Sequence, residues 1–135
     1  MFLSQAIQKN PRQKISFKKV ILGAGWEPGH STDWDAVLVA KALGAKTIVN
    51  MTNVDVLYDK DPRKYKSAKP IKKTTWNGLL KITGTKWRAG MNFPFDPTAS
   101  KLAKKYKLKL ILIGKNLNNF RRFLDKKLFK GSVVV

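Results

Sequence analysis

The chain of 135 residues contains no cysteine and a single histidine. The lack of cysteine excludes disulfide bonds, thiolate zinc sites and a thiol nucleophile. His30 alone cannot build a metal centre from several imidazoles. No apolar run approaches the roughly 18 residues that span a bilayer, and the first residues lack a secretory signal pattern. We therefore expect one compact domain in the cytoplasm, with a core drawn from the 43% of residues that are hydrophobic.

Acidic residues are also scarce. The chain has 8 Asp and Glu against 28 Lys and Arg, which gives a formal net charge of +20. Such an excess is typical of nucleic-acid binders. Lysine is far commoner than arginine, however, and Lys101, Lys104 and Lys105 fall on the expected outer face of a helix. We therefore interpret the charge mainly as solvated helix surface and leave a nucleic-acid partner as the less favoured alternative.

Alternating apolar runs and turns in the first half predict an α/β fold. Residues 2–8 are interpreted as the end of a helix, which Asn10 and Pro11 break. The β-branched runs at 18–24 and 47–51 predict buried parallel strands. A helix over 34–43 lies between them, with Asp33 as its predicted cap and Gly44 as its end. Strands about two dozen residues apart suit a right-handed βαβ crossover, so both should end at the same edge of one sheet.

The second half repeats this alternation. Asp96 followed by Pro97 predicts a strong helix start, and Asn116 predicts a second cap. The helix after Asn116 should turn Leu117, Phe120, Phe123 and Leu124 inward. The expected elements are, in order, a surface loop over 61–73, a helix over 75–82, a long loop over 84–97, a helix over 97–106, a strand over 110–113, the helix after Asn116 and a strand over 132–135.

Two polar turns follow the first two expected strands, where an open α/β sheet builds its ligand site. In the first, residues 29–32 offer hydroxyls, backbone N–H groups and a helix dipole to an anion, although an ordinary capped turn is the favoured explanation when these residues are taken alone. Asp33 and Asp35 do not face one another on a helix, and Asp33 is the better candidate for chemistry. The glycines of GAGWEPG fit neither a P-loop nor the dinucleotide fingerprint.

Several motifs in a fixed order carry a family resemblance. PGHSTD, VNMTNVDVLYDKDP, AKPIKK and PFDPTASKLA resemble segments of uridylate kinases of the amino acid kinase superfamily. The resemblance covers residues 18–135 and matches only the carboxyl-terminal, nucleotide-binding portion of such an enzyme. It implies a three-layer α/β/α sandwich with a mostly parallel sheet, truncated at its amino terminus, with residues 1–17 as the remnant of a preceding helix and linker. It also implies a homo-oligomer that transfers the ATP γ-phosphoryl group to UMP, with Mg²⁺ carried by the nucleotide.

The resemblance assigns roles to individual residues. Asp33 matches an aspartate near the transferred phosphoryl group, and Asp96 matches a second one. A carboxylate there would orient cations or magnesium rather than act as a base. No residue is assigned as a dedicated metal ligand. The expected UMP contacts are Trp26, Glu27, Pro28, Gly29, His30, Ser31 and Thr32, and the expected ATP contacts are Thr52, Asn53, Tyr58 and Asp61.

The chain also departs from the family pattern. Val56 stands where the family usually has glycine, so the backbone there must avoid a conformation that only glycine favours. The family's glycine-rich phosphate loop, early lysine and arginine-bearing helix have no counterpart, and Lys86 and Arg88 are only loosely placed substitutes. We therefore expect weak nucleotide binding and poor catalysis from this chain alone. The alternatives are a related kinase with a carboxylate or carbamate acceptor, and a non-catalytic basic nucleotide- or RNA-binding module.

Overall fold

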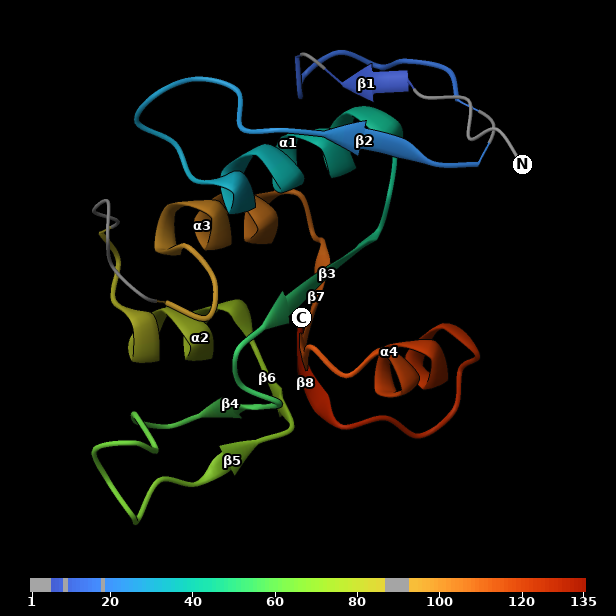
Figure 1. The fold of residues 1–135 in the computed structure, drawn as a ribbon. Helices are drawn as coiled ribbons and strands as arrows, with labels where there is room; N and C mark the ends of the chain where they lie inside the picture. The colour runs from blue at the N-terminus through green and yellow to red at the C-terminus, as the bar shows by residue number, and fades with distance from the viewer. Residues whose placement is uncertain (1–5, 9, 18, 87–92) are drawn as a thin grey trace.

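The computed structural model describes residues 6–8, 10–17, 19–86 and 93–135. A four-stranded sheet in the order β3-β7-β8-β6 forms its centre (Figure 1). β3 (Thr47–Thr52) runs parallel to β7 (Lys109–Gly114), and β6 (Lys73–Thr74) runs parallel to β8 (Gly131–Val134). β7 and β8 are antiparallel. The pairing is therefore mostly parallel, as predicted for the α/β class.

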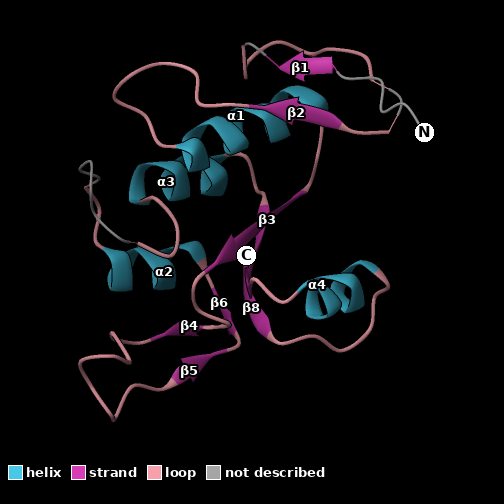
Figure 2. Ribbon diagram, in the orientation of Figure 1, coloured by secondary structure: helices cyan, strands magenta, loops and turns pink. Residues whose placement is uncertain are grey.

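Helices cover both faces of this sheet. α1 (Thr32–Leu43), α2 (Trp76–Thr83) and α3 (Pro97–Lys105) lie on one side, and α4 (Leu117–Leu124) lies on the other (Figures 1 and 2). The result is the predicted three-layer α/β/α arrangement. No helix within the described ranges is both long enough and apolar enough to cross a membrane.

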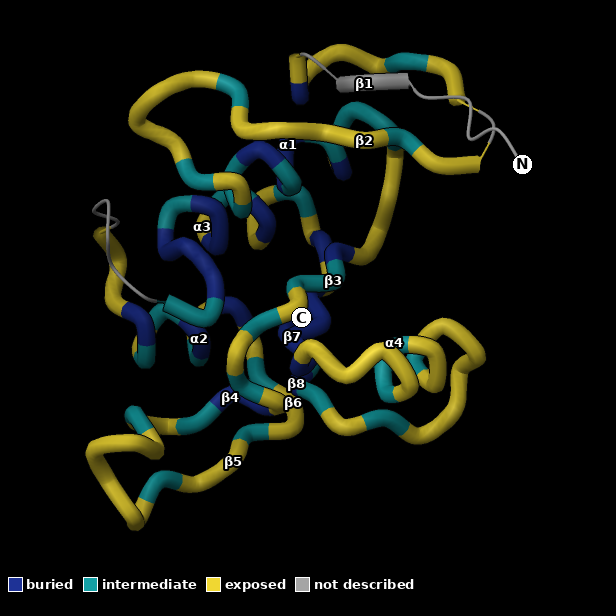
Figure 3. The backbone as a smooth tube through the Cα atoms, viewed as in Figure 1, coloured by how far each residue is buried: buried dark blue, intermediate teal, exposed yellow. Residues whose placement is uncertain are grey.

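The core lies between the sheet and the layer of three helices. β7 is buried along both of its faces (Figure 3), which explains why its sequence is continuously apolar. Leu110 and Leu112 of β7 pack in one cluster with Val37, Leu79 and Ala99 of the helices. Within this cluster the indole Nε1 of Trp76 donates to the backbone carbonyl of Leu108 at 2.9 Å, so its polar atom is satisfied.

Three expectations for the amino-terminal region are wrong. Residues 6–8 form a strand, β1 (Ala6–Gln8), because parallel pairing with β2 (Ile21–Gly23) satisfies the backbone there, while residues 2–5 lie outside the described residues. β2 therefore belongs to a separate two-stranded sheet and does not share a sheet with β3. Ser31 rather than Asp33 caps α1, because its backbone is extended and its Oγ accepts from Trp34 N at 3.2 Å.

Other local signals are confirmed. Gly44 ends α1 with a φ of 71°, a left-handed conformation that glycine adopts at low cost. Asp96 and Asn116 cap α3 and α4. Val56 has no positive φ, so it replaces glycine without the strain of a left-handed backbone.

The remaining corrections concern segments with little regular pattern. The loop expected over 61–73 contains β5 (Pro70–Ile71), which pairs with β4 (Leu57–Tyr58), and the start of β6. Leu117 and Leu124 of α4 are 72% and 60% exposed rather than turned inward. This helix contacts its surroundings through half-buried phenylalanines, since Phe123 packs edge-on against Phe129 at 5.1 Å between ring centroids. Residues 87–92 of the expected long loop lie outside the described residues.

Candidate functional site

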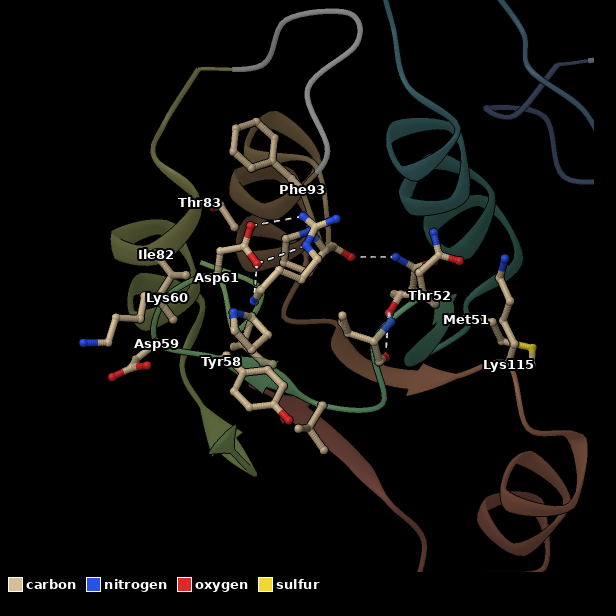
Figure 4. Close-up of a pocket in the computed structure, with 18 of the residues that line it drawn as sticks. Met51, Thr52, Tyr58, Asp59, Lys60, Asp61, Ile82, Thr83, Phe93 and Lys115 are labelled. Atoms are coloured by element: carbon tan, nitrogen blue, oxygen red, sulfur yellow. Dashed lines mark hydrogen bonds and ion pairs between the residues drawn. The ribbon is translucent and has the colours of Figure 1, made fainter. Parts of the chain in front are cut away.

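A cavity of about 800 Å³ opens at the carboxyl ends of β3 and β7 (Figure 4). The end of β3, the turn that follows it and the segment 59–63 form much of its wall. Asp33 in the first turn of α1 and Lys115 just after β7 also line it. The cavity therefore lies at the sheet edge where the two polar turns were expected to meet.

The turn between β3 and β4 is held by its own side chains and by β7. Thr52 Oγ1 accepts from Val54 N at 3.1 Å and donates to Val54 O at 2.8 Å. Asp55 lies directly against Gly114 of β7, where an added Cβ would stand 2.1 Å from Asp55 Oδ1. The Nζ of Lys130 contacts Asp55 Oδ2 at 2.7 Å. These contacts give the cavity wall a defined position.

The β4–β5 hairpin is anchored to the sheet by one buried hydroxyl. Ser132 Oγ accepts from Leu57 N at 2.8 Å and donates to Ile71 O at 2.6 Å. Ser132 has no exposed surface, and Leu57 is 2% exposed. A single side chain of β8 therefore satisfies one backbone group on each strand of the hairpin that carries Tyr58.

Asp61 and Arg63 form a tight ion pair at the rim of the cavity. The carboxylate of Asp61 accepts from the backbone N of Arg63 at 2.9 Å and from its Nε and Nη2 at 3.1 Å. These bonds to a cation hold the pKa of Asp61 below its usual value. Lys60 and Lys115 are the other basic residues that line the cavity among the described residues. Asp33, Asp59 and Asp61 also line the cavity, so its wall carries as many acidic as basic side chains, and any phosphate would have to be met by individual cations rather than by a net positive charge.

Residues from two distant parts of the sequence, Ser31 with Asp33 and Asp96, meet beside the cavity. Asp96 N donates to Asp33 Oδ2 at 2.8 Å, and the hydroxyl of Ser31 donates to Asp96 Oδ2. Asp96 is 3% exposed, and its Oδ1 also accepts from the backbone and the hydroxyl of Thr98, each at 2.6 Å. Burial raises the pKa of Asp33, the hydrogen bond from Asp96 N opposes that rise, and the negative charge of Asp96 adds to it.

The structure brings together some of the predicted site residues and not others. Thr52, Asn53, Tyr58 and Asp61, all predicted for ATP, line the cavity together with Asp33. Asp96 does not line the cavity and contacts it only through the hydrogen bond of its backbone N to Asp33.

None of the residues 26–32, predicted for UMP, lines the cavity. Ser31 donates to Asp96, which does not line the cavity itself. The ring of His30 stacks on Trp34 with centroids 5.3 Å apart, and Trp26 N donates to Asp35 Oδ2 at 3.1 Å. Glu27, Pro28, Gly29 and Thr32 are exposed. The predicted UMP turn therefore lies next to the cavity rather than in it.

Sequence reasoning missed several residues of the cavity. Lys60, Arg63 and Lys115 line it, whereas Lys86, which was considered as a cation, does not, and Arg88 lies outside the described residues. Asn50 also lines it and donates from Nδ2 to Pro94 O at 2.8 Å. Two of these residues had a recognisable sequence signal. Lys115 is a cation directly after a strand, and Asn50 is an amide within a strand. Among the described residues, no three His, Cys, Asp or Glu side chains are grouped so as to hold a metal ion.

Comparison with known proteins decides the family. The sequence profile of the amino acid kinase family matches residues 17–114 of this chain. The chain belongs to the amino acid kinase family. Its sheet and covering helices are the fold of that family, as the resemblance implied.

Individual members of the amino acid kinase family give further detail. The uridylate kinase of Methanococcus aeolicus is 43% identical over 100 residues, which are 73% of this chain and 44% of that protein. The uridylate kinase of Thermoplasma volcanium is 37% identical over 112 residues, or 82% of this chain and 49% of that protein. The crystal structure of uridylate kinase from Archaeoglobus fulgidus matches with a TM-score of 0.72 at 29% identity and covers 88% of this chain and 53% of that one. The chain therefore spans about half the length of the relatives it matches.

Proposed function

We propose that this chain is the carboxyl-terminal, nucleotide-binding portion of a uridylate kinase, which transfers the γ-phosphoryl group of ATP to UMP. The observation that carries the proposal is the grouping of Asp33 with all four predicted ATP residues around one cavity. Four of these residues lie within the segment 52–61, and the fold brings Asp33 of α1 to them. Two archaeal relatives with 37–43% identity carry the name uridylate kinase, which supports the same acceptor.

The cavity suits the donor nucleotide. Its volume of about 800 Å³ lies within the range of small-molecule sites. Thr52, Asn53 and Tyr58 would contact the adenine and ribose, while Lys115 would face the phosphates. The Nζ of Lys60 lies over the ring of Tyr65, 5.6 Å from its centroid, and points away from the cavity (Figure 4). Magnesium would bind to the ATP phosphates and would need only one or two protein carboxylates. Asp33 could contact this ion or a cationic side chain. Bound there, the ion would neutralise charge on the transferred group.

The predicted UMP turn is joined to the cavity through two aspartates. Ser31 donates to Asp96, and Asp96 N donates to Asp33, so this hydrogen-bonded chain connects the two proposed substrate sites. Phosphoryl transfer depends mainly on alignment and on charge around the moving group. We assign Asp33 to the reacting groups and Asp96 to positioning, since Asp96 is buried and engaged by Thr98.

The remainder of the kinase would complete this site. β3 is paired on one side only, with β7, in the sheet that the described residues form. Two buried polar atoms of α1, Trp34 Nε1 and Asp35 Oδ1, have no hydrogen-bond partner among the described residues. Unsatisfied buried groups and a free strand edge suit docking of further polypeptide. The relatives have about as much sequence again beyond the match. From the family resemblance alone we also infer a cytoplasmic homo-oligomer.

The site assignment can be tested on the chain alone by amide chemical-shift mapping. Titration with Mg-ATP should shift signals of Thr52, Asn53 and Tyr58, and titration with UMP should shift those of Gly29 and Ser31. Weak, millimolar affinities are expected because the rest of the kinase is not supplied. AMP and CMP serve as controls for the acceptor. If UMP shifts the cavity residues and leaves Gly29 and Ser31 unchanged, the acceptor site is wrongly placed.

A further inference from the structure

The two ends of the sheet differ in acidic residues: the cavity end has them, together with Lys60, Arg63 and Lys115, whereas two segments at the opposite end have none. Asp33, Asp59 and Asp61 line the cavity, and Asp55 and Asp96 lie directly behind its wall. The segments 41–46 and 104–109 contain no acidic residue. They contain six exposed lysines, which we call the basic pole: Lys41, Lys46, Lys104, Lys105, Lys107 and Lys109.

The fold places the two segments of the basic pole side by side. Each follows or ends a helix, α1 or α3, and leads into a strand, β3 or β7. Because β3 and β7 are parallel and paired from Thr47 and Lys109 onward, both segments lie at the amino ends of these strands (Figure 1). Lys109 N donates to Lys46 O at 2.9 Å, and Lys41 Nζ lies 5.1 Å from the ring centroid of Tyr106. The basic pole is thus at the end of the strands opposite the cavity.

The charge of the basic pole is not compensated locally. The carboxyl ends of α1 and α3 carry about half a negative charge each. About five positive charges remain after these contributions. No ion pair among the described residues includes any of the six lysines, and Lys104 Nζ bonds only to the neutral Asn77 Oδ1, at 2.8 Å.

We propose that the basic pole binds the phosphodiester backbone of nucleic acid. Clustered lysine ammonium groups attract successive phosphates without reading bases, so binding should be independent of sequence. An anionic membrane is the less suitable partner, because surfaces that lie on membranes combine lysines with exposed large apolar side chains. The large hydrophobic residues that are exposed in the described part of the chain lie outside 41–46 and 104–109, and of them Val135, next to Val134 of β8, lies at the same end of the sheet. One exposed valine is a small apolar surface for a membrane. Because the basic pole is opposite the cavity, the chain should be able to bind nucleic acid and ATP at the same time.

The test is fluorescence anisotropy with labelled 12-nucleotide oligo(U) and oligo(dU) over a range of salt. If each lysine meets one phosphate, the slope of log K against log salt is about −4, so affinity should fall roughly 300-fold between 50 and 200 mM. The triple variant K46Q/K107Q/K109Q should have about half that slope. The control K64Q/K66Q/K69Q removes the same charge from exposed positions of the β4–β5 loop, at the far end of the molecule in Figure 1, and should keep nearly the parent slope.

Three outcomes would overturn the proposal. Equal loss of binding in both triple variants would mean that overall charge, not the basic pole, attracts the probe. Displacement of the oligonucleotide by Mg-ATP would place it in the cavity. Tighter binding to phosphatidylserine vesicles than to either oligonucleotide, lost in K46Q/K107Q/K109Q, would identify a membrane partner instead. Urea unfolding of both variants checks that each remains folded, and comparison of oligo(U) with oligo(dU) shows whether the sugar contributes.

Discussion

Replacement of Gly114 by alanine should destabilise the chain through a clash at the wall of the cavity. A Cβ on Gly114 would lie 2.1 Å from Asp55 Oδ1 and 3.2 Å from both Asp55 Cγ and Asp55 Cα. The first contact is shorter than any real Cβ contact, and the last involves backbone, which cannot swing away. The Asp55 carboxylate can rotate away from the first contact only by leaving its ion pair with Lys130, and relief of the last contact requires the turn after β3 to shift by a few tenths of an ångström against the buried Gly114.

The expected cost follows from overpacking in a well-ordered interior, which is about 1–3 kcal/mol. Urea unfolding followed by tryptophan fluorescence would measure it as a lower midpoint at unchanged slope. Gly25→Ala is a matched control, because Gly25 has no atom within 4 Å of the added methyl group and no positive φ. That control should change the free energy of unfolding by less than about 0.5 kcal/mol.

A double-mutant cycle with Asp55→Ala isolates the contact. The substitution removes Oδ1 and Cγ, so Gly114→Ala should cost at least about 0.5 kcal/mol less in the Asp55→Ala background. Loss of the exposed ion pair with Lys130 should contribute little by itself, because solvent screens it. If Gly114→Ala and Gly25→Ala cost the same, or if the cycle shows no coupling, the turn is not held against β7 as described.

Three further predictions concern the hairpin, the buried carboxylate and the core. Ser132→Ala should cost about 1–3 kcal/mol in urea unfolding, because it leaves the backbone N of Leu57 and the carbonyl of Ile71 without their buried partner. Asp33 has a raised pKa, so it contributes stability that is present below its ordinary pKa of 3.8 and is lost as pH rises through the native pKa. Asp33→Asn should remove that part of the pH dependence in unfolding curves recorded from pH 3 to 7. Leu79→Ala should cost about 2–5 kcal/mol, since Leu79 is fully buried.

Each of these predictions has its own control. Ser67→Ala, at an exposed position, should leave stability within about 0.5 kcal/mol, and an equal effect of the two serine substitutions would contradict the anchoring role of Ser132. An unchanged pH profile in Asp33→Asn would show that this carboxyl group does not couple to folding. Leu117→Ala, at a position that is 72% exposed, should be nearly neutral beside Leu79→Ala.

Local signals predicted much of the fold. The Asp96-Pro97 helix start, the Asn116 cap and the Gly44 terminus are confirmed because each depends on a few neighbouring residues and their backbone conformation. The buried strand β7 was evident from its continuous apolar run. These features need no knowledge of the rest of the chain.

Long-range pairing was the part that sequence could not supply. β1 and β2 pair with each other, although the spacing of β2 and β3 suggested that these two shared a sheet. β5 and β6 contain two residues each, too few for any hydrophobic period to be recognised. The exposure of Leu117 and Leu124 likewise depends on how α4 docks, which its own sequence does not determine.

The candidate site shows the same division. The resemblance supplied the residues, and the structure places Asp33 and the four predicted ATP residues around one cavity. The bond from Asp96 N to Asp33 joins positions 63 residues apart, so no local pattern predicts it. Lys60 and Lys115 were missed because their sequence surroundings resemble those of the many other exposed lysines of this basic chain, and only the folded structure shows that they line the cavity.

The most direct test of the proposed function is UMP-dependent formation of ADP from Mg-ATP. We would assay the 135-residue chain alone and after co-expression with the amino-terminal half of the Methanococcus aeolicus uridylate kinase, with AMP, CMP and acetate as alternative acceptors. The proposal predicts little turnover by the chain alone and turnover selective for UMP once the second half is bound. A stable complex that forms no ADP with UMP, or that prefers acetate, would contradict it.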